Sequence, residues 1–397
     1  MRPVHAALCP VALLAACAGE APIDTAETAI LADDTGAEPA DCAPAARFTD
    51  PSGAVTDLYA DLASGTAAAP APLALTGPGT LTLSCATFYA QISATEPLIL
   101  VGEGDASLDG GGLGVPLTAS GASLEITGLR IENGFGSLGG CVRFTGDRLA
   151  LSGVSLSGCE AAIGGGIYAE ADEVMISDSV FSTNAADLTL TGGAEPYRGG
   201  ALYLGASVAT IQGSRFEQNT AGDPVYSLSD TRGGGIYQVG GAITLSGCTF
   251  LRNAAQNGYE ADNQGGALWT GGSATVTDSD VTDNRAGGSG GAVYASGAGL
   301  YVADALTLVR ATLSGNTNVD KYGLGAGAAA DAGSIAISDS TVTGNDSDST
   351  VAGALNAWGG GVCSTSSFSG NAPADASAGW DTTTSLLACE AGTDVIW

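Results

Sequence analysis

The side chains that could carry chemistry are few in this chain, and histidine is almost absent. The only histidine is His5, within an N-terminal segment that we interpret as a cleaved signal. A mature chain without histidine cannot run a Ser-His-Asp or Cys-His mechanism, because both need an imidazole to accept the proton of the nucleophile. The sequence therefore predicts no catalytic residue of that kind.

Aromatic side chains recur at one fixed position after pairs of glycines. Three residues after the second glycine of each pair stand Tyr168, Tyr203, Tyr237, Trp269 and Tyr294. An aliphatic residue precedes each of them, and neighbouring side chains of a strand point to opposite faces. Because the aliphatic residue suits a core better, we expect the rings to form an exposed column that binds ligands, with flat rings stacking on sugars. The alternative is an internal aromatic stack.

Charged side chains also recur between repeats. Asp278, Arg310 and Asp339 occupy equivalent positions of consecutive repeats, and Arg252 faces Asp283 in the same way. Alternating charge at this spacing is typical of ion pairs between neighbouring strands, which stabilise a surface only weakly. We therefore interpret these residues as surface pairs.

Metal binding has little support in the sequence. No two cysteines have the Cys-x-x-Cys spacing, and the lack of histidine further disfavours zinc. Asp-rich turns at 278–280 and 346–348 could bind calcium, although they match no EF-hand loop. We expect no metal site and no cofactor, with calcium the one ion left open.

A repeat positions all of these residues. Its units close at Gly134, Cys159, Asn184, Asn219, Asn253, Asn284, Asn316, Asn345 and Asn371. Nearly every unit has apolar residues three, eight and ten positions before its close, and small or aliphatic residues five before it. Apolar positions two apart indicate strands, and the one break in that period indicates a bend. Each unit is too short to bury its own apolar face, so successive units must stack.

Two motifs mark the repeat. The first is Gly-Gly-Ala-aliphatic, at 199–202, 265–268 and 290–293; the second is Phe-x-x-Asn, which begins at Phe181, Phe216, Phe250 and Phe368. Over residues 98–371 these motifs resemble the repeats of the polymorphic outer-membrane proteins. The resemblance implies an all-β, right-handed parallel β-helix of the pectin-lyase-like kind, with about nine or ten coils and an N-terminal cap.

That resemblance also brings an enzymatic alternative. Pectate lyases of this fold use calcium-binding aspartates and an arginine base, and its polygalacturonases carry a Gly-His-Gly motif. Gly-His-Gly is missing from this chain, and no adjacent outward columns of the predicted strands stack two carboxylates. A polysaccharide lyase or glycoside hydrolase is therefore our second interpretation.

The closing asparagines and the cysteines predict internal cross-links. Stacked asparagine side chains can bond one coil to the next, so we expect a ladder inside the solenoid. Spacing alone leaves the disulfide connectivity open. From their places in the chain we favour Cys42–Cys85, Cys141–Cys159 and Cys363–Cys389, with Cys248 as a buried thiol.

The N-terminus predicts export and anchoring. Residues 1–16 have the features of a signal peptide, and the run Leu14-Ala15-Ala16-Cys17 resembles the lipobox of bacterial lipoproteins, which implies lipidation of Cys17. An acidic tether would cover 17–45, an N-terminal cap 46–97, the β-helix 98–371 and a C-terminal cap 372–397. Within the first cap, Val55, Leu58, Tyr59 and Leu62 stand at helical spacing and predict one amphipathic helix.

Net charge limits the partners. The chain holds 42 acidic and 12 basic residues, a formal net charge of −30, which repels nucleic acid. Membrane contact is expected through the lipid anchor only. Our leading interpretation is a non-enzymatic lipoprotein of the bacterial cell envelope, at the outer membrane or outside the cell, that binds polysaccharide or a cell-surface protein. A purely structural envelope spacer is the third interpretation.

Overall fold

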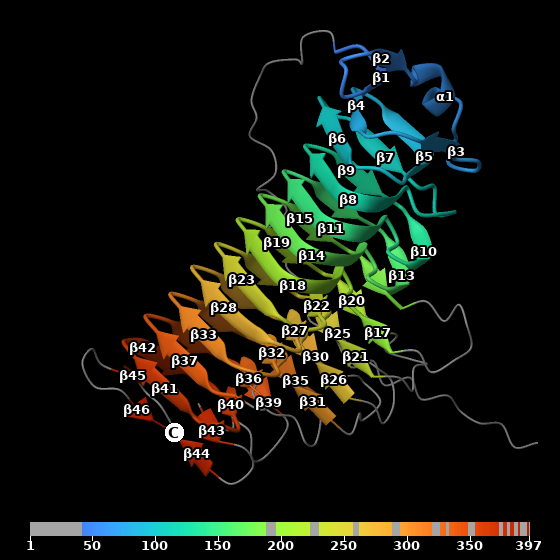
Figure 1. The fold of residues 1–397 in the computed structure, drawn as a ribbon. Helices are drawn as coiled ribbons and strands as arrows, with labels where there is room; N and C mark the ends of the chain where they lie inside the picture. Colours follow the sequence, from blue (N-terminus) through green and yellow to red (C-terminus); the bar gives the residue numbers. More distant parts are fainter. Residues whose placement is uncertain are drawn as a thin grey trace, which may run out of the picture. The chain divides into compact units, whose positions relative to one another are not determined.

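The computed structural model describes residues 42–187, 196–222, 230–256, 262–287, 294–319, 326–330, 333–347 and 354–372, and four short C-terminal strands. The predicted signal peptide, the predicted lipidation site Cys17 and the predicted tether as far as residue 41 lie outside the described residues. Within them the chain is a parallel β-helix, as predicted, and successive coils follow one another in sequence order (Figure 1).

One long sheet runs along the solenoid and pairs coil to coil in parallel. Its first four strands are β8 (Leu117–Thr127), β11 (Val142–Ser152), β14 (Ile167–Ser177) and β18 (Leu202–Gln212). In later coils each strand is split in two. These pairs are β22 (Ile236–Gln238) with β23 (Ala242–Ser246), β27 (Leu268–Thr270) with β28 (Ser273–Thr277), β32 (Leu300–Val302) with β33 (Leu306–Val309), β36 (Ala328–Ala330) with β37 (Ile335–Ser338), and β40 (Leu355–Ala357) with β41 (Gly361–Ser364).

A second sheet of short strands follows the bend that the sequence predicts. Its members are β7 (Ser107–Asp109), β9 (Arg130–Glu132), β12 (Ser155–Ser157), β15 (Val180–Ser182), β19 (Arg215–Glu217), β24 (Thr249–Leu251), β29 (Asp280–Thr282), β34 (Thr312–Ser314), β38 (Thr341–Thr343) and β42 (Ser366–Ser369). The bend residue has positive φ, for example 57° at Gly213 and 49° at Asp278, a conformation that favours glycine.

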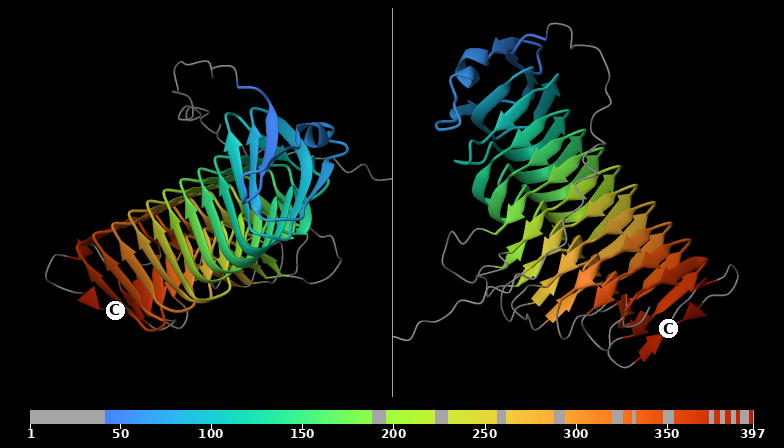
Figure 2. Two further views of the ribbon diagram at one scale, coloured as in Figure 1. Left: turned by 45° about the horizontal axis from the view of Figure 1, so that its top comes forward. Right: turned by 180° about the vertical axis from the view of Figure 1, so that it is seen from behind.

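A third sheet closes each coil in two short runs. One run holds β10 (Phe135–Leu138), β13 (Glu160–Ile163), β16 (Ala185–Ala186), β20 (Thr220–Ala221), β25 (Ala254–Ala255), β30 (Arg285–Ala286), β35 (Thr317–Asn318) and β39 (Asp346–Ser347). The other holds β17 (Tyr197–Arg198), β21 (Thr231–Arg232), β26 (Asp262–Gln264) and β31 (Tyr294–Ser296). Figure 2 shows the stacked coils from two further directions.

The glycine pairs form the corner between the third sheet and the long sheet. Gly199 has a φ of 69°, and a Cβ on Gly200 would collide with the carbonyl oxygen of Gly234 in the next coil. Gly199 is therefore needed for its backbone conformation, and Gly200 is needed because the backbones of two adjacent coils approach closely there.

The first cap differs in detail from the prediction. The helix is short, α1 (Tyr59–Ala63), and buries Leu62. Val55 lies instead in β2 (Val55–Asp57), 61% exposed, because β2 pairs with β1 (Ala45–Thr49). The expectation of one longer helix was wrong at this residue. The cap also holds β3 (Ala71–Leu75), β4 (Gly79–Ser84), β5 (Thr87–Ala94) and β6 (Leu98–Glu103).

Short strands also end the chain. They are β43 (Ala376–Ala378), β44 (Thr382–Thr384), β45 (Ala388–Cys389) and β46 (Val395–Ile396). β45 and β46 run antiparallel to β42 and β41, the last strands of the parallel stack. Because β45 and β46 pair in the antiparallel direction, the parallel pairing of the coils ends there.

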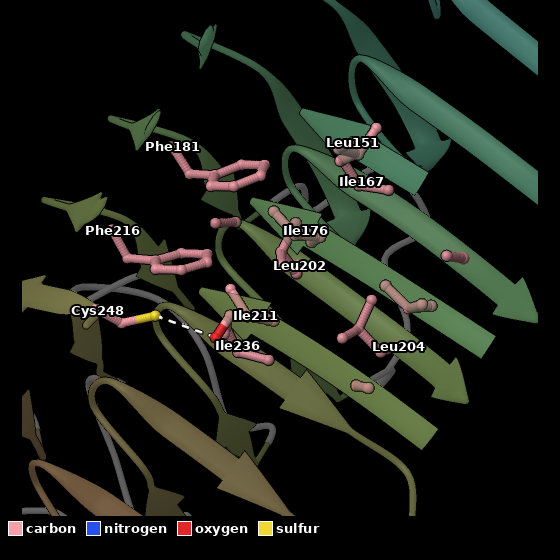
Figure 3. Close-up of a cluster of buried hydrophobic side chains, with 14 of the residues drawn as sticks. Leu151, Ile167, Ile176, Phe181, Leu202, Leu204, Ile211, Phe216, Ile236 and Cys248 are labelled. Atoms are coloured by element: carbon pink, nitrogen blue, oxygen red, sulfur yellow. Dashed lines mark hydrogen bonds between the residues drawn. The ribbon is translucent and has the colours of Figure 1, made fainter. Parts of the chain in front are cut away.

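Apolar columns fill the interior. Phe181, Phe216 and Phe250 stack face to face, with ring centroids 4.8 Å apart at both contacts. Figure 3 shows two of these rings packed beside the aliphatic columns of the long sheet. Cys248 is a buried free thiol, as expected, and its Sγ lies 3.4 Å from the Ile211 carbonyl oxygen. Burial raises the pKa of this thiol.

The predicted cross-links are confirmed. The asparagine ladder runs from Asn184 to Asn371. From Asn219 on, each amide Oδ1 accepts from the side chain and the backbone N–H of the preceding asparagine. Asn184 Oδ1 accepts from the backbone N–H of Cys159. The three disulfides are Cys42–Cys85, Cys141–Cys159 and Cys363–Cys389. Together they hold the coils and both ends of the described β-helix in one register.

Candidate functional site

The outer aromatic column exists, but its fifth member is not the residue that the sequence suggested. Strand pairing aligns Tyr168, Tyr203, Tyr237, Trp269 and Tyr301 on consecutive coils. Tyr294 lies in β31 of the third sheet, opposite Asp262. The prediction of Tyr294 is therefore wrong.

A second glycine-rich run caused this error. The corner of that coil is Gly297, with a φ of 57°, just as Gly265 forms the corner before it with 65°. The pair at 290–291 comes too early in the coil. Tyr301 and Trp269 lie equally far before their closing asparagines, whereas Tyr294 lies seven residues further back. Counting from the asparagine would have found Tyr301.

The rings of this column stack on one another. Centroids are 4.7, 5.3, 4.5 and 6.0 Å apart along the column, and no pair of planes deviates by more than 17°. Each inner ring therefore has its two faces covered by neighbours, and only its edge can meet solvent. Sugar stacking needs a free ring face, so this geometry does not favour it at the inner rings.

Exposure also differs along the column. The rings lie outside the coil interior, as strand alternation predicts, since Ile236 and Leu268 point inward and are fully buried. Tyr168 and Tyr203 are half-buried. Tyr237 is only 4% exposed and Trp269 8%, so the expectation that these two rings are exposed was wrong.

Arginines of the third sheet cover the buried rings. The guanidinium carbon of Arg198 lies 5.1 Å from the Tyr237 ring centroid, and that of Arg232 lies 5.1 Å from the Trp269 ring. Cation–π attraction at this distance holds the guanidinium group against the ring. Trp269 also donates from Nε1 to Oε1 of Gln264 at 2.9 Å. The outer column is thus partly enclosed by its own chain.

The exposed end of the column has polar neighbours. The Tyr168 hydroxyl donates to Oε1 of Glu170 at 2.8 Å. Partial burial, then the hydrogen bond and charge of Glu170, raise the pKa of Tyr168 well above its usual value. Burial and Glu170 also raise the pKa of Tyr203. Both phenols stay neutral hydrogen-bonding groups at physiological pH, and neither becomes a tyrosinate base.

A hollow of about 210 Å³ lies on the outer face of the long sheet, away from the aromatic column. Glu125, Arg148, Met175, Thr210 and Gln212 are among its lining residues. Sequence analysis missed it, because Glu125, Arg148 and Met175 do not recur from coil to coil and so left no periodic signal.

One lining residue of the hollow, Arg148, contacts both Met175, which also lines it, and Glu173, which does not. Its Nε lies 3.2 Å from a Glu173 carboxylate oxygen, and its Nη2 lies 3.2 Å from the Met175 sulfur. The hollow therefore combines the Arg148 guanidinium group, which is paired with Glu173 outside it, the Glu125 carboxylate and the apolar Met175 side chain.

Four threonines continue from the hollow along the same sheet. Strand pairing places Thr210, Thr244, Thr275 and Thr307 on consecutive coils, and we call them the threonine column. They alternate with buried Ile211, Leu245, Val276 and Leu308, so they face outward. No hydroxyl of the four has a hydrogen-bond partner among the described residues. Sequence analysis did not single out this column, although a threonine stands nine positions before each of four consecutive closing asparagines, Asn219, Asn253, Asn284 and Asn316.

The expected surface ion pairs form in part. Arg310 binds Asp278 with both ends of its guanidinium group, at 2.6 and 2.7 Å. That contact lowers the pKa of Asp278. Among the described side chains, no ion pair joins Arg252 to Asp283. Ion pairing between coils is therefore local and does not form a continuous ladder.

Neither a metal-binding cluster nor a membrane-spanning helix is found in the described part of the chain. No group of three or more His, Cys, Asp or Glu side chains there could hold a metal ion. No helix in the same residues has the length and apolar character needed to cross a membrane.

Comparison with known proteins identifies the fold family. The family model described as the right-handed beta helix region matches residues 113–305 and 165–372, which together cover more than half of the chain. Searches of the curated proteins and of the solved structures found no match.

Proposed function

Because the chain belongs to the right-handed β-helix family, we propose that it is a non-enzymatic β-helix that binds glycan or protein at the bacterial cell envelope. The observation that carries this proposal is the repetition of side chains on the outer face of the long sheet. The same residue type faces solvent on consecutive coils, hydroxyls in the threonine column and aromatic edges at Tyr168 and Tyr203. A repeated surface can hold a repeating ligand at several points at once.

The scaffold behind this face suits recognition. The asparagine ladder satisfies the interior polar groups, and the strands of successive coils are bonded along the whole stack. A surface fixed in this way loses little conformational freedom when a ligand binds. Preorganisation therefore supports a binding role for the outward columns.

A glycan array and a cell-binding assay with the purified chain test the proposal. We expect a saturable ligand that is released unchanged. A chain that binds nothing in either assay would leave the structural spacer as the better interpretation.

We extend the proposal to an anchor at Cys17. Its support is the Leu14-Ala15-Ala16-Cys17 run, followed by an acidic segment without a basic residue before Cys42. A thioether-linked lipid would hold the β-helix at the outer membrane. Cys17→Ser should move the protein from the detergent phase to the aqueous phase, and unchanged partitioning would refute the anchor.

A second candidate function rests on the hollow. Glu125 and Arg148 bring a carboxylate and a guanidinium group to one concave site, which are the group types that a polysaccharide lyase needs. A lyase would release unsaturated sugars from a glycan and would lose that activity in Arg148→Ala. Product analysis of every glycan that binds distinguishes the two functions.

A further inference from the structure

We propose that the ligand of the long sheet is a neutral, unbranched polysaccharide that lies along the threonine column with one end in the hollow. This inference rests on the proposed function and specifies its ligand. The occupant follows from four properties of the face, which are its charge, its free hydroxyls, its spacing and its shape.

Charge is the first property. No charged residue occurs in the six consecutive strand segments β18, β23, β28, β33, β37 and β41. The three preceding long strands, in contrast, carry outward charges such as Glu125, Arg148 and Glu173. In a chain of net charge −30 this neutral area is the part of the long sheet where a ligand need not carry compensating charge. A polyanion would be repelled by the rest of the molecule, so a neutral ligand fits best.

Hydrogen-bonding capacity is the second property. Three pairs of hydroxyls in the second sheet bond to each other across coils, for example Thr343 to Ser369 at 2.8 Å. The threonine column makes no such bond within the described residues. Each of its hydroxyls can both donate and accept. A sugar hydroxyl has the same two capacities, so a neutral glycan can bond to every coil.

Spacing and shape are the third and fourth properties. Adjacent coils of a β-solenoid repeat at about 4.8 Å, a step comparable to one sugar of an extended chain. The hollow at Thr210 is smaller than the pockets that enclose whole drug-sized ligands, and so it suits one terminal sugar. Because neighbouring rings cover the faces in the aromatic column, recognition here depends on hydroxyl contacts more than on stacking.

The test compares hydroxyl removal on two sheets. The full chain, purified in detergent, is assayed by pull-down on cellulose, chitin and β-1,3-glucan, with polygalacturonate as the acidic probe. We expect binding to at least one neutral polymer, and on the order of tenfold weaker binding by Thr244→Val plus Thr275→Val, because two hydrogen bonds are lost. The matched control is Thr341→Val plus Thr343→Val on the second sheet, which should bind as the wild type does.

The outcomes separate this inference from the proposed function. Equal binding by the Thr244 and Thr275 double variant, with an unchanged melting temperature, overturns the threonine column as the site. Binding to polygalacturonate alone, or to a cell-surface protein alone, overturns the neutral ligand while the binding function stands. A chain that binds no polymer and no cell overturns both. Neutral binding that is insensitive to salt and reduced only in the long-sheet variant supports the inference.

Discussion

Two aromatic stacks follow the axis of this molecule, one inside the coils and one outside. The interior stack, Phe181 to Phe250, has ring centroids 4.8 Å apart and is fully buried. The outer stack begins at Tyr168, and its spacing varies between 4.5 and 6.0 Å. Coil stacking imposes ring stacking in both places. It does not determine what surrounds the rings.

That difference decides what each stack can do. Inside, the neighbours of Phe216 are other apolar columns, so its role is packing. Outside, Tyr237 and Trp269 lie under Arg198 and Arg232, whereas Tyr168 and Tyr203 keep partly open edges. Stacking of rings thus gives a core in one place and a partly covered surface in the other. Five predictions test how far that contrast holds.

The largest effect is expected from the interior stack. Phe216→Ala removes the middle ring of a fully buried column and leaves a cavity between Phe181 and Phe250. We expect the free energy of unfolding to fall by about 3–5 kcal/mol, measured by denaturant titration. If Phe216→Ala lowers the free energy of unfolding no more than removal of an outer ring does, the two stacks contribute equally to stability.

The asparagine ladder tests the polar part of the same interior. Asn253→Ala leaves the Phe216 carbonyl without its donor and two donors of Asn219 without their acceptor. One unpaired buried group costs about 1–3 kcal/mol, so the loss should reach at least that range. Thr244→Ala on the outer face is the control and should unfold near the wild-type midpoint.

The outer stack is expected to show a gradient. Trp269 is nearly buried, stacks on Tyr237 and Tyr301, and bonds to Gln264, whereas Tyr203 is half-buried. Two ring contacts are worth about 1–3 kcal/mol together, in addition to the area that the ring buries, so Trp269→Ala should lose at least that much. Tyr203→Ala should cost less. Equal losses would show that the arginine cover contributes nothing to the burial of Trp269.

The sequence predicted the interior better than the exterior, for a physical reason. Interior positions must satisfy packing and hydrogen bonding in every coil. Residue types such as those of Asn253 and Phe250 therefore recur at equivalent positions, and the repeat can be counted from them. The three disulfides were favoured from the places of their cysteines in the chain, since spacing alone left the connectivity open, and the structure forms all three. The burial of an outer side chain depends on residues from other sheets, as that of Trp269 depends on Arg232. No period along one strand reveals such a contact.

The errors at the candidate site have the same origin. Tyr294 was chosen from a local glycine pair, while the register is set across coils by Asn316 and its neighbours. The hollow beside Arg148 depends on residues that occur once, so no repeat could indicate it. The threonine column was periodic and could have been found. It was overlooked because its hydroxyls form no part of the core.

A smaller effect, of opposite sign, is expected at a corner of the coil. Thr183 has a φ of 53°, a left-handed conformation that a β-branched residue adopts only with strain, while Gly344 stands at the equivalent corner of another coil. Thr183→Gly should raise the free energy of unfolding by about 0.5–1 kcal/mol, since relief of strain exceeds the entropy cost of glycine.

The reverse exchange is the control for this corner. A Cβ at Gly344 would meet nothing closer than 4.0 Å, so Gly344→Thr introduces the strain without a clash. It should destabilise by a similar amount. If both substitutions lower stability, strain is not what distinguishes the two corners.

The smallest effect is expected from the exposed ion pair. Arg310 holds Asp278 with two hydrogen bonds, yet both side chains are at least half exposed. Solvent and salt screen such a pair, so Arg310→Ala should leave the unfolding midpoint at neutral pH nearly unchanged. The pKa of Asp278 is lowered by Arg310, so any stability from the pair is present above the usual aspartate pKa and is lost as pH falls through the lowered value. Denaturant titrations of wild type and variant at neutral and acid pH measure this. A midpoint shift at neutral pH as large as that of Asn253→Ala would show that the outer columns stabilise the coils as strongly as the interior ones.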